Sequence, residues 1–158
     1  MTRDFSALPG GRVVLGIRSE ASRVKVEFHD KDNHSDVYIT GVEPGVEKFC
    51  SIPVSALKGI DISRVRAVLF GVEREANPGS IDIRADVLGV RDFTVPAPTG
   101  GELFASSAPN DAATASWTGD HAIRISTSGS FTYCVTGGFT YPGEGANLVR
   151  NEIRRAHV

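Results

Sequence analysis

The chain has 158 residues, 41% of them hydrophobic, and this length and composition fit one domain with a substantial apolar core. Its 17 lysines and arginines nearly balance its 19 aspartates and glutamates, which argues against a nucleic-acid-binding protein, because such proteins rely on a surplus of cations. No run of about 18 apolar residues occurs, so the sequence predicts no membrane insertion, and residues 1–5 lack the apolar stretch of a signal peptide.

Alternating apolar and polar residues predict short β-strands along the first part of the chain. The strand segments are residues 12–18, 23–29, 37–40, 48–52, 65–72 and 81–87. Successive side chains of a strand point to opposite faces, so this alternation is typical of strands with one buried face. Residues 65–72 are apolar on both faces, which predicts a central strand. The polar residues 30–36 contain the Asp and Asn of a turn and predict an antiparallel hairpin.

The second part of the chain changes in composition. Residues 96–119 are rich in Pro, Ala, Gly, Ser and Thr and predict a linker or a long surface loop. The remaining strands are predicted in residues 120–145, and residues 146–158 form a tail or a short helix. With the main strand set in residues 1–95, the whole chain 1–158 is predicted to be a single all-β domain, an antiparallel β-sandwich.

Five sequence segments between residues 4 and 88 follow one another in a familiar order. They read DFSAL, VVLGIRS, VKVEFHD, FCSIPVSALKGIDISRVRAVLF and GSIDIRADVL. This order, over about half of the chain, resembles carbohydrate-binding modules of the galactose-binding-like sandwich class, which accompany glycoside hydrolases and polysaccharide lyases. Such modules begin with further strands, and residues 101–142 look like that missing opening. A circularly rearranged module and a cut through tandem modules both explain this order.

The resemblance implies a jelly-roll sandwich that binds a polysaccharide or oligosaccharide outside the cell, in a native protein with a covalently linked catalytic domain. Sugar binding needs flat apolar side chains for the pyranose ring and polar groups for its hydroxyls. The aromatic candidates are Trp117, expected in a polar loop outside the core, with Tyr141 and Tyr38. The polar candidates are strand residues expected to point away from the core, namely Arg18, Lys25, Glu27, Arg66 and Arg84. The alternative is a solvated polar face with ordinary ion pairs, such as Arg18 with Glu27.

A calcium ion is the only cofactor for which the sequence offers candidates. Asp30 and Asp32 supply hard oxygen ligands within the 30–36 segment, although a plain hairpin turn explains the same residues. The resemblance also implies structural calcium near the sandwich edge, for which Asp82 and Glu102 are the candidates. Cys50 and Cys134 both fall in strand segments, where two buried thiols are favoured over one disulfide.

The sequence gives little indication of catalysis. It contains none of the common nucleophile, zinc-protease or phosphate-binding motifs, and its four histidines show no metal-ligand spacing. We therefore expect a noncatalytic carbohydrate-binding module. The alternatives are a protein-interaction or assembly module on the same sandwich, and a small lyase or hydrolase that gathers Lys25, His29, Tyr38 and Arg66 in one groove.

Overall fold

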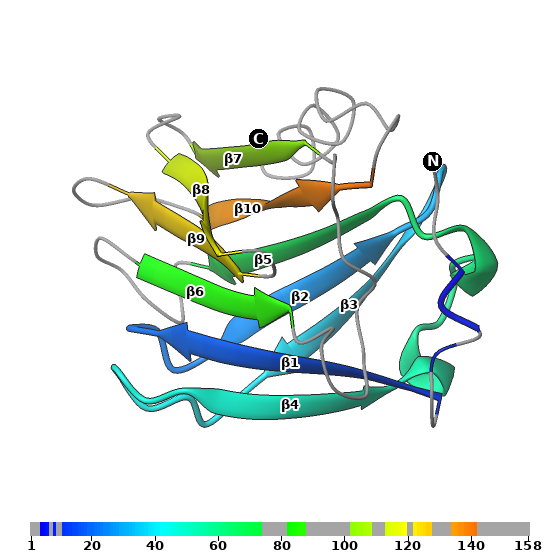
Figure 1. Ribbon diagram of the computed structural model, residues 1–158, viewed down its shortest axis with the longest axis horizontal. Helices are drawn as coiled ribbons and strands as arrows, with labels where there is room; N and C mark the ends of the chain where they lie inside the picture. Colours follow the sequence, from blue (N-terminus) through cyan, green and yellow to red (C-terminus); the bar gives the residue numbers. More distant parts are fainter. Residues whose placement is uncertain are drawn as a thin grey trace.

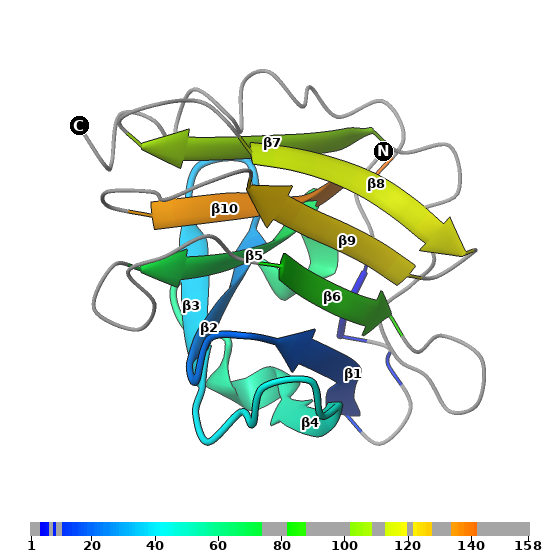
Figure 2. The same cartoon turned by 90° about the vertical axis from the view of Figure 1, so that its left-hand side faces the viewer.

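The computed structural model describes residues 4–6, 8, 11–73, 82–87, 102–108, 113–119, 122–127 and 134–141. These residues form two five-stranded antiparallel sheets (Figures 1 and 2). The first sheet has the order β4 (Lys48–Pro53), β1 (Arg12–Ser19), β6 (Asp82–Val87), β9 (Ala122–Thr127) and β8 (Ala113–Gly119). The second sheet has the order β3 (His34–Ile39), β2 (Val24–His29), β5 (Ala67–Glu73), β10 (Cys134–Thr140) and β7 (Leu103–Ala108).

The chain passes from one sheet to the other at most connections, and only β2–β3 and β8–β9 are consecutive strands within one sheet. Two short 3-10 turns, η2 (Val54–Ala56) and η3 (Ile62–Arg64), lie between β4 and β5. The all-β antiparallel sandwich expected from the sequence is confirmed. Within the described residues, no helix combines the length and the apolar character that crossing a bilayer requires.

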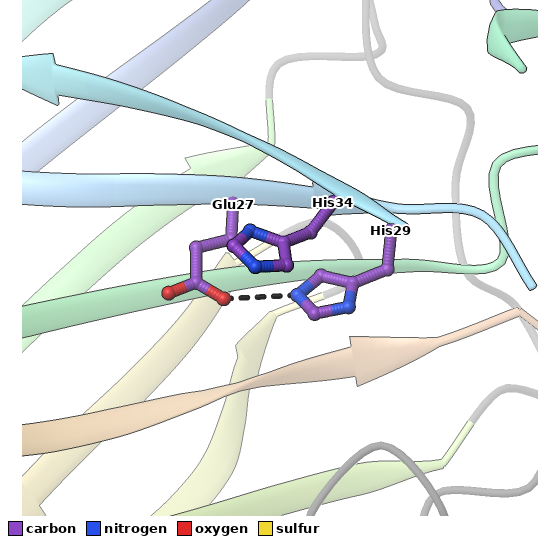
Figure 3. Close-up of side chains that lie close together, drawn as sticks. All are labelled: Glu27, His29 and His34. Atoms are coloured by element: carbon purple, nitrogen blue, oxygen red, sulfur yellow. Dashed lines mark hydrogen bonds and ion pairs between the residues drawn. The ribbon is translucent and has the colours of Figure 1, made fainter. Parts of the chain in front are cut away.

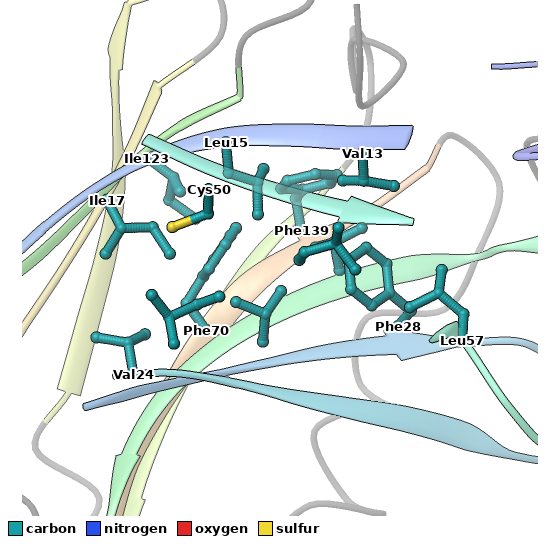
Figure 4. Close-up of a cluster of buried hydrophobic side chains, with 14 of the residues drawn as sticks. Val13, Leu15, Ile17, Val24, Phe28, Cys50, Leu57, Phe70, Ile123 and Phe139 are labelled. Carbon is teal, nitrogen blue, oxygen red and sulfur yellow. The ribbon is translucent and has the colours of Figure 1, made fainter. Parts of the chain in front are cut away.

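The core lies between the two sheets and follows the alternation of the strands (Figure 4). The inward side chains of β1 and β2 have no exposed area: Val13, Leu15, Ile17, Val24, Val26 and Phe28. Burying a side chain of this kind contributes about 1.5–3 kcal/mol, so these two strands supply much of the apolar stabilisation. Cys50 of β4 is a free thiol in the same cluster, and burial raises its pKa.

Strand β5 occupies the centre of the second sheet and is buried on both faces, which confirms the prediction of a central strand. Its inward residues are Val68, Phe70 and Val72, whereas Leu69 faces the other side of the sheet. Leu69 instead packs with Ala67 and Phe104 in a separate small cluster, in register with the outward residues of β2.

The prediction of a loop over residues 96–119 is wrong, because β7 and β8 both lie there. Each is an outermost strand with a single hydrogen-bonded neighbour. An outermost strand buries less side-chain area than a central one, so the alanines, serines and threonines of LFASSA and ATASWTG suffice. The prediction of a tail or short helix over residues 146–158 lies outside the described residues.

Candidate functional sites

The β2–β3 hairpin brings together the polar residues of two strands on the outer face of the second sheet. The strands pair in antiparallel register, so that Lys25, Glu27 and His29 of β2 lie opposite Tyr38, Asp36 and His34 of β3. Residues directly opposite in an antiparallel pair project to the same face, so these six side chains share one surface. The β2 members are 8%, 5% and 4% exposed, which makes this surface a buried polar cluster along β2.

Asp30 organises the turn that joins these strands. Its Oδ1 accepts hydrogen bonds from the main-chain N–H groups of Asp32 (2.8 Å) and Asn33 (2.6 Å), and its Oδ2 accepts one from Asp61 (2.8 Å). Burial alone would raise the pKa of Asp30, but these three hydrogen bonds outweigh it and lower the pKa.

Both oxygens of Asp30 therefore accept hydrogen bonds from the main chain, as the hairpin-turn alternative requires. Asp32 has an exposed side chain and takes part in the turn through its main-chain N–H. The hydrogen bonds of this pair are those of a structural turn, and its role as a calcium site stays a prediction.

Glu27 is the centre of the buried polar cluster. Its Oε1 accepts a hydrogen bond from Lys25 Nζ at 2.8 Å, and its Oε2 lies 2.9 Å from His29 Nε2 (Figure 3). Burial would raise the pKa of Glu27, but the hydrogen bond with His29 and the charge and hydrogen bond of Lys25 together lower it to about 2. Glu27 is therefore an ionised carboxylate inside the protein, held by a cation on one side and an imidazole on the other.

Glu73 links this cluster to the exposed end of the hairpin. It lies 3.4 Å from Lys25 Nζ, accepts a hydrogen bond from the Tyr38 hydroxyl at 3.1 Å, and pairs with Arg23 at 3.4 Å. The Arg23 guanidinium also lies 4.9 Å from the centre of the Tyr38 ring. Tyr38 is 46% exposed, but one side of its ring and its hydroxyl already have protein partners.

The second sheet also contains a group of potential metal ligands. His29 and His34 face each other across the hairpin with stacked rings 5.2 Å apart, and ligand atoms of Glu27, His29 and His34 all lie within 4.8 Å of one another. The spacing of the histidines in the sequence did not indicate that His29 and His34 come together with Glu27. The sequence does contain the information for this contact. Residues 30–33 form the turn of a hairpin, and such a turn sets the residues just before and after it, here His29 and His34, opposite each other.

The expected single polar face does not exist, because its residues lie on different sheets. Arg18 is exposed on β1 in the first sheet, whereas Lys25 and Glu27 are buried on β2 in the second, so the suggested pair of Arg18 with Glu27 is wrong. Arg66 is 6% exposed just before β5, where its main chain bonds to His29 and Tyr141. Strand alternation predicted which residues point outward but not which sheet carries them.

Two of the three aromatic candidates, Trp117 and Tyr141, do not lie where the sequence analysis expected them. Tyr141 has no exposed area and packs between Phe5 and Phe139, so its ring offers no face to a ligand. Trp117 is a residue of strand β8, not of a loop, and its ring lies 6.0 Å from that of Phe139. It pairs with inward-facing Ile123 and is 38% exposed, so it partly covers the core at the edge of the first sheet.

The two acidic residues implied as calcium ligands by the resemblance lie on different sheets. Glu102 is exposed and leads into β7 of the second sheet, where its carbonyl accepts the N–H of Thr140 at 2.9 Å. Asp82 begins β6 of the first sheet, and its side chain lies outside the described residues, as does that of Arg84. The strand positions give no sign of a shared site.

Three arginines occupy matching positions on adjacent strands of the first sheet. In the register of β1, β6 and β9, Arg18 lies opposite Arg84, and Arg84 lies opposite Arg124. Phe49 of β4 projects to the same face, paired with Gly16, and is 67% exposed. Phe49 and Arg124 were missed from the sequence, although inward-facing Cys50 and Ile123 next to them in the chain predict their outward direction.

Comparison of the chain with protein-family models, with curated proteins and with solved structures found no match.

Proposed function

We propose that this chain is a noncatalytic binding module for an acidic polysaccharide, on a jelly-roll sandwich of the galactose-binding-like class. The ligand would lie across the outer face of the first sheet. The observation that carries the proposal is the register that aligns Arg18, Arg84 and Arg124 on three adjacent strands.

The chemistry of arginine favours an acidic ligand. The register sets arginines at matching positions of three adjacent strands, so an anionic chain that runs across these strands would meet a cationic residue on each of them. The guanidinium group is planar and binds a carboxylate through two parallel hydrogen bonds, which suits a chain of uronic acid residues.

Phe49 supplies the apolar part of such a site. It is the most exposed of the large hydrophobic side chains on the described part of the chain, and it lies on the same face one strand beyond Arg18. An exposed phenyl ring is a flat surface for the C–H groups of a pyranose ring. In this proposal Phe49 takes the role that the sequence analysis gave to Trp117 and Tyr141.

Affinity gel electrophoresis tests the proposal with polygalacturonate and alginate as acidic polymers and a neutral glucan as the comparison. We expect retardation by an acidic polymer only, weakening as salt is raised. Arg18→Ala and Phe49→Ala should each weaken retention at least several-fold. Lys58→Ala is the matched control, since it removes the same charge from an exposed position outside both sheets. Equal migration in all gels, or full retention by Arg18→Ala, would refute the proposal.

A protein-interaction or assembly module is the second candidate, favoured by an exposed apolar pair at the edge of the first sheet. Val46, three residues before Phe49, is 53% exposed in the turn before β4. Among the described strands β4 is an outermost one, and the backbone edge of such a strand is able to pair with another chain. Size-exclusion chromatography with light scattering distinguishes the two functions. A dimer that Phe49→Ser converts to monomer would favour assembly over glycan binding.

A further inference from the structure

The group formed by Glu27, His29 and His34 on the second sheet has the chemistry of a transition-metal site. We infer that these three residues bind one divalent ion of the zinc class at the end of the β2–β3 hairpin. This site lies on the opposite sheet from the proposed glycan surface and is independent of it.

The hairpin places the three ligands without requiring a change in the backbone. His29 and His34 are directly opposite in the register, and Glu27 lies two residues before His29 and therefore on the same face. Glu27 Oε2 lies 2.9 Å from His29 Nε2, and all three ligand atoms lie within 4.8 Å of one another. Atoms bound to one zinc ion at about 2.0–2.1 Å are roughly 3–4 Å apart, so the His34 ring must rotate out of its stacked position against His29 to direct a nitrogen at the ion.

His34 has the freedom for that rotation, since its side chain is 51% exposed, whereas those of Glu27 and His29 are 6% and 5% exposed. The site thus has two buried ligands, Glu27 and His29, and one half-exposed ligand, His34. The three side chains lie close together (Figure 3). Three protein ligands leave a fourth position for water or for a ligand group.

Two of the three ligands, His34 and Glu27, already interact with neighbouring side chains of the kind that orient the ligands in metal sites. Asp36 Oδ1 lies 2.7 Å from His34 Nδ1, and a hydrogen on that nitrogen leaves Nε2 free to bind the ion. Lys25 donates to Glu27 Oε1 and so leaves Oε2 directed toward His29. Glu73, 3.4 Å from Lys25 Nζ, reduces the repulsion between Lys25 and a cation bound at Glu27.

The ligand set selects the class of ion. Two imidazoles and one carboxylate suit zinc, cobalt or iron(II), whereas calcium takes six to eight oxygen ligands. The site therefore differs in chemistry as well as in position from the calcium site considered for Asp30 and Asp32.

Cobalt(II) and zinc(II) titrations of the full chain, purified without a histidine tag, test this inference. We expect one equivalent of cobalt(II) to produce visible absorption bands of a four-coordinate ion, which zinc(II) then removes. Zinc(II) should also raise the melting temperature, whereas calcium(II) should have no effect.

The variants assign the ion to these residues. His34→Ala removes a half-exposed ligand and should retain the fold while lowering cobalt affinity at least 10-fold, and Asp36→Asn should weaken it about 10- to 100-fold. Asp32→Ala is the matched control, an exposed residue of the same hairpin turn, and should bind as the parent does. The absence of cobalt bands in the parent chain, or equal affinity in His34→Ala, would overturn the inference.

Discussion

Replacement of Asp30 by alanine tests whether this carboxylate holds the hairpin turn. The substitution removes the acceptor of three main-chain N–H groups, those of Asp32, Asn33 and Asp61. A buried donor left without a partner costs about 1–3 kcal/mol. Because Asp32, Asn33 and Asp61 are exposed residues, water replaces part of this loss, and we expect the free energy of unfolding to fall by about 2–4 kcal/mol.

Asparagine at this position separates the two oxygens of the carboxylate. Asp30→Asn retains an acceptor for Asp32 and Asn33 but places an amide NH₂ against the N–H of Asp61, so about half of the alanine effect should remain. The pKa of Asp30 is lowered in the folded protein. Its contribution is therefore present above the unfolded pKa of about 3.9 and disappears as the pH falls through the folded value, so wild type and Asp30→Asn should converge in acid.

Urea unfolding followed by circular dichroism measures these differences as shifts of the midpoint at constant slope. Asp32→Ala serves as the control and should stay within about 0.5 kcal/mol of the parent, as is usual for an exposed side chain. The reasoning fails if Asp30→Ala unfolds at the parent midpoint. It also fails if calcium(II) raises the midpoint of the parent and not that of Asp30→Ala, because Asp30 would then be a calcium ligand.

Three further predictions concern the core and the buried polar cluster. Gly138→Ala should lower the free energy of unfolding by about 3 kcal/mol or more, since a Cβ at Gly138 would lie 2.1 Å from the carbonyl oxygen of Val68. Thermal unfolding measures this, and Gly59→Ala, at a φ of +80° in open space, should cost only about 1–2 kcal/mol. The pKa of Glu27 falls from 4.5 to about 2 on folding, so its stabilisation is complete above pH 4.5 and is lost toward pH 2. An acid titration of Glu27→Gln should therefore show a shallower loss of stability over that range, and a curve parallel to the parent would contradict the ionised state of Glu27. Trp117→Ala should lower stability by about 1–3 kcal/mol, because the ring covers Phe139. Circular dichroism is the appropriate signal, because the substitution removes the single tryptophan of the chain. Unchanged stability would contradict a role of Trp117 in covering the core and would favour its interpretation as a flat surface for a sugar ring.

The β2–β3 hairpin shows which structural features strand alternation alone predicts in this protein. The pattern VKVEFH alone predicts that Val24, Val26 and Phe28 enter the core and that Lys25 and Glu27 do not. It also predicts the turn, since Asp30 and the residues after it have the chemistry that a tight connection needs. The direction of the β2 side chains and the position of the turn are local properties. The first depends on the alternation within one strand, and the second depends on the hydrogen bonds that the Asp30 carboxylate accepts.

The arrangement of the candidate sites depends on pairing between distant segments. Periodicity predicts that Arg18 and Glu27 both point outward, but only the assignment of β1 and β2 to different sheets places them on opposite sides of the sandwich. In the same way, the alternation of Ala, Ser and Thr in β7 and β8 is too weakly apolar to reveal a strand until a neighbouring strand completes the hydrogen-bonded ladder.

The sequence by itself therefore determined the fold class, most of the strands and the inward residues of β1 and β2, because these follow from alternation along the chain. The tertiary structure decided that Lys25, Glu27 and His29 are buried, that Tyr141 is a core residue, and that His29 meets His34. The physical reason is that burial and side-chain proximity are set by the register and stacking of strands far apart in the sequence, which a local pattern does not encode.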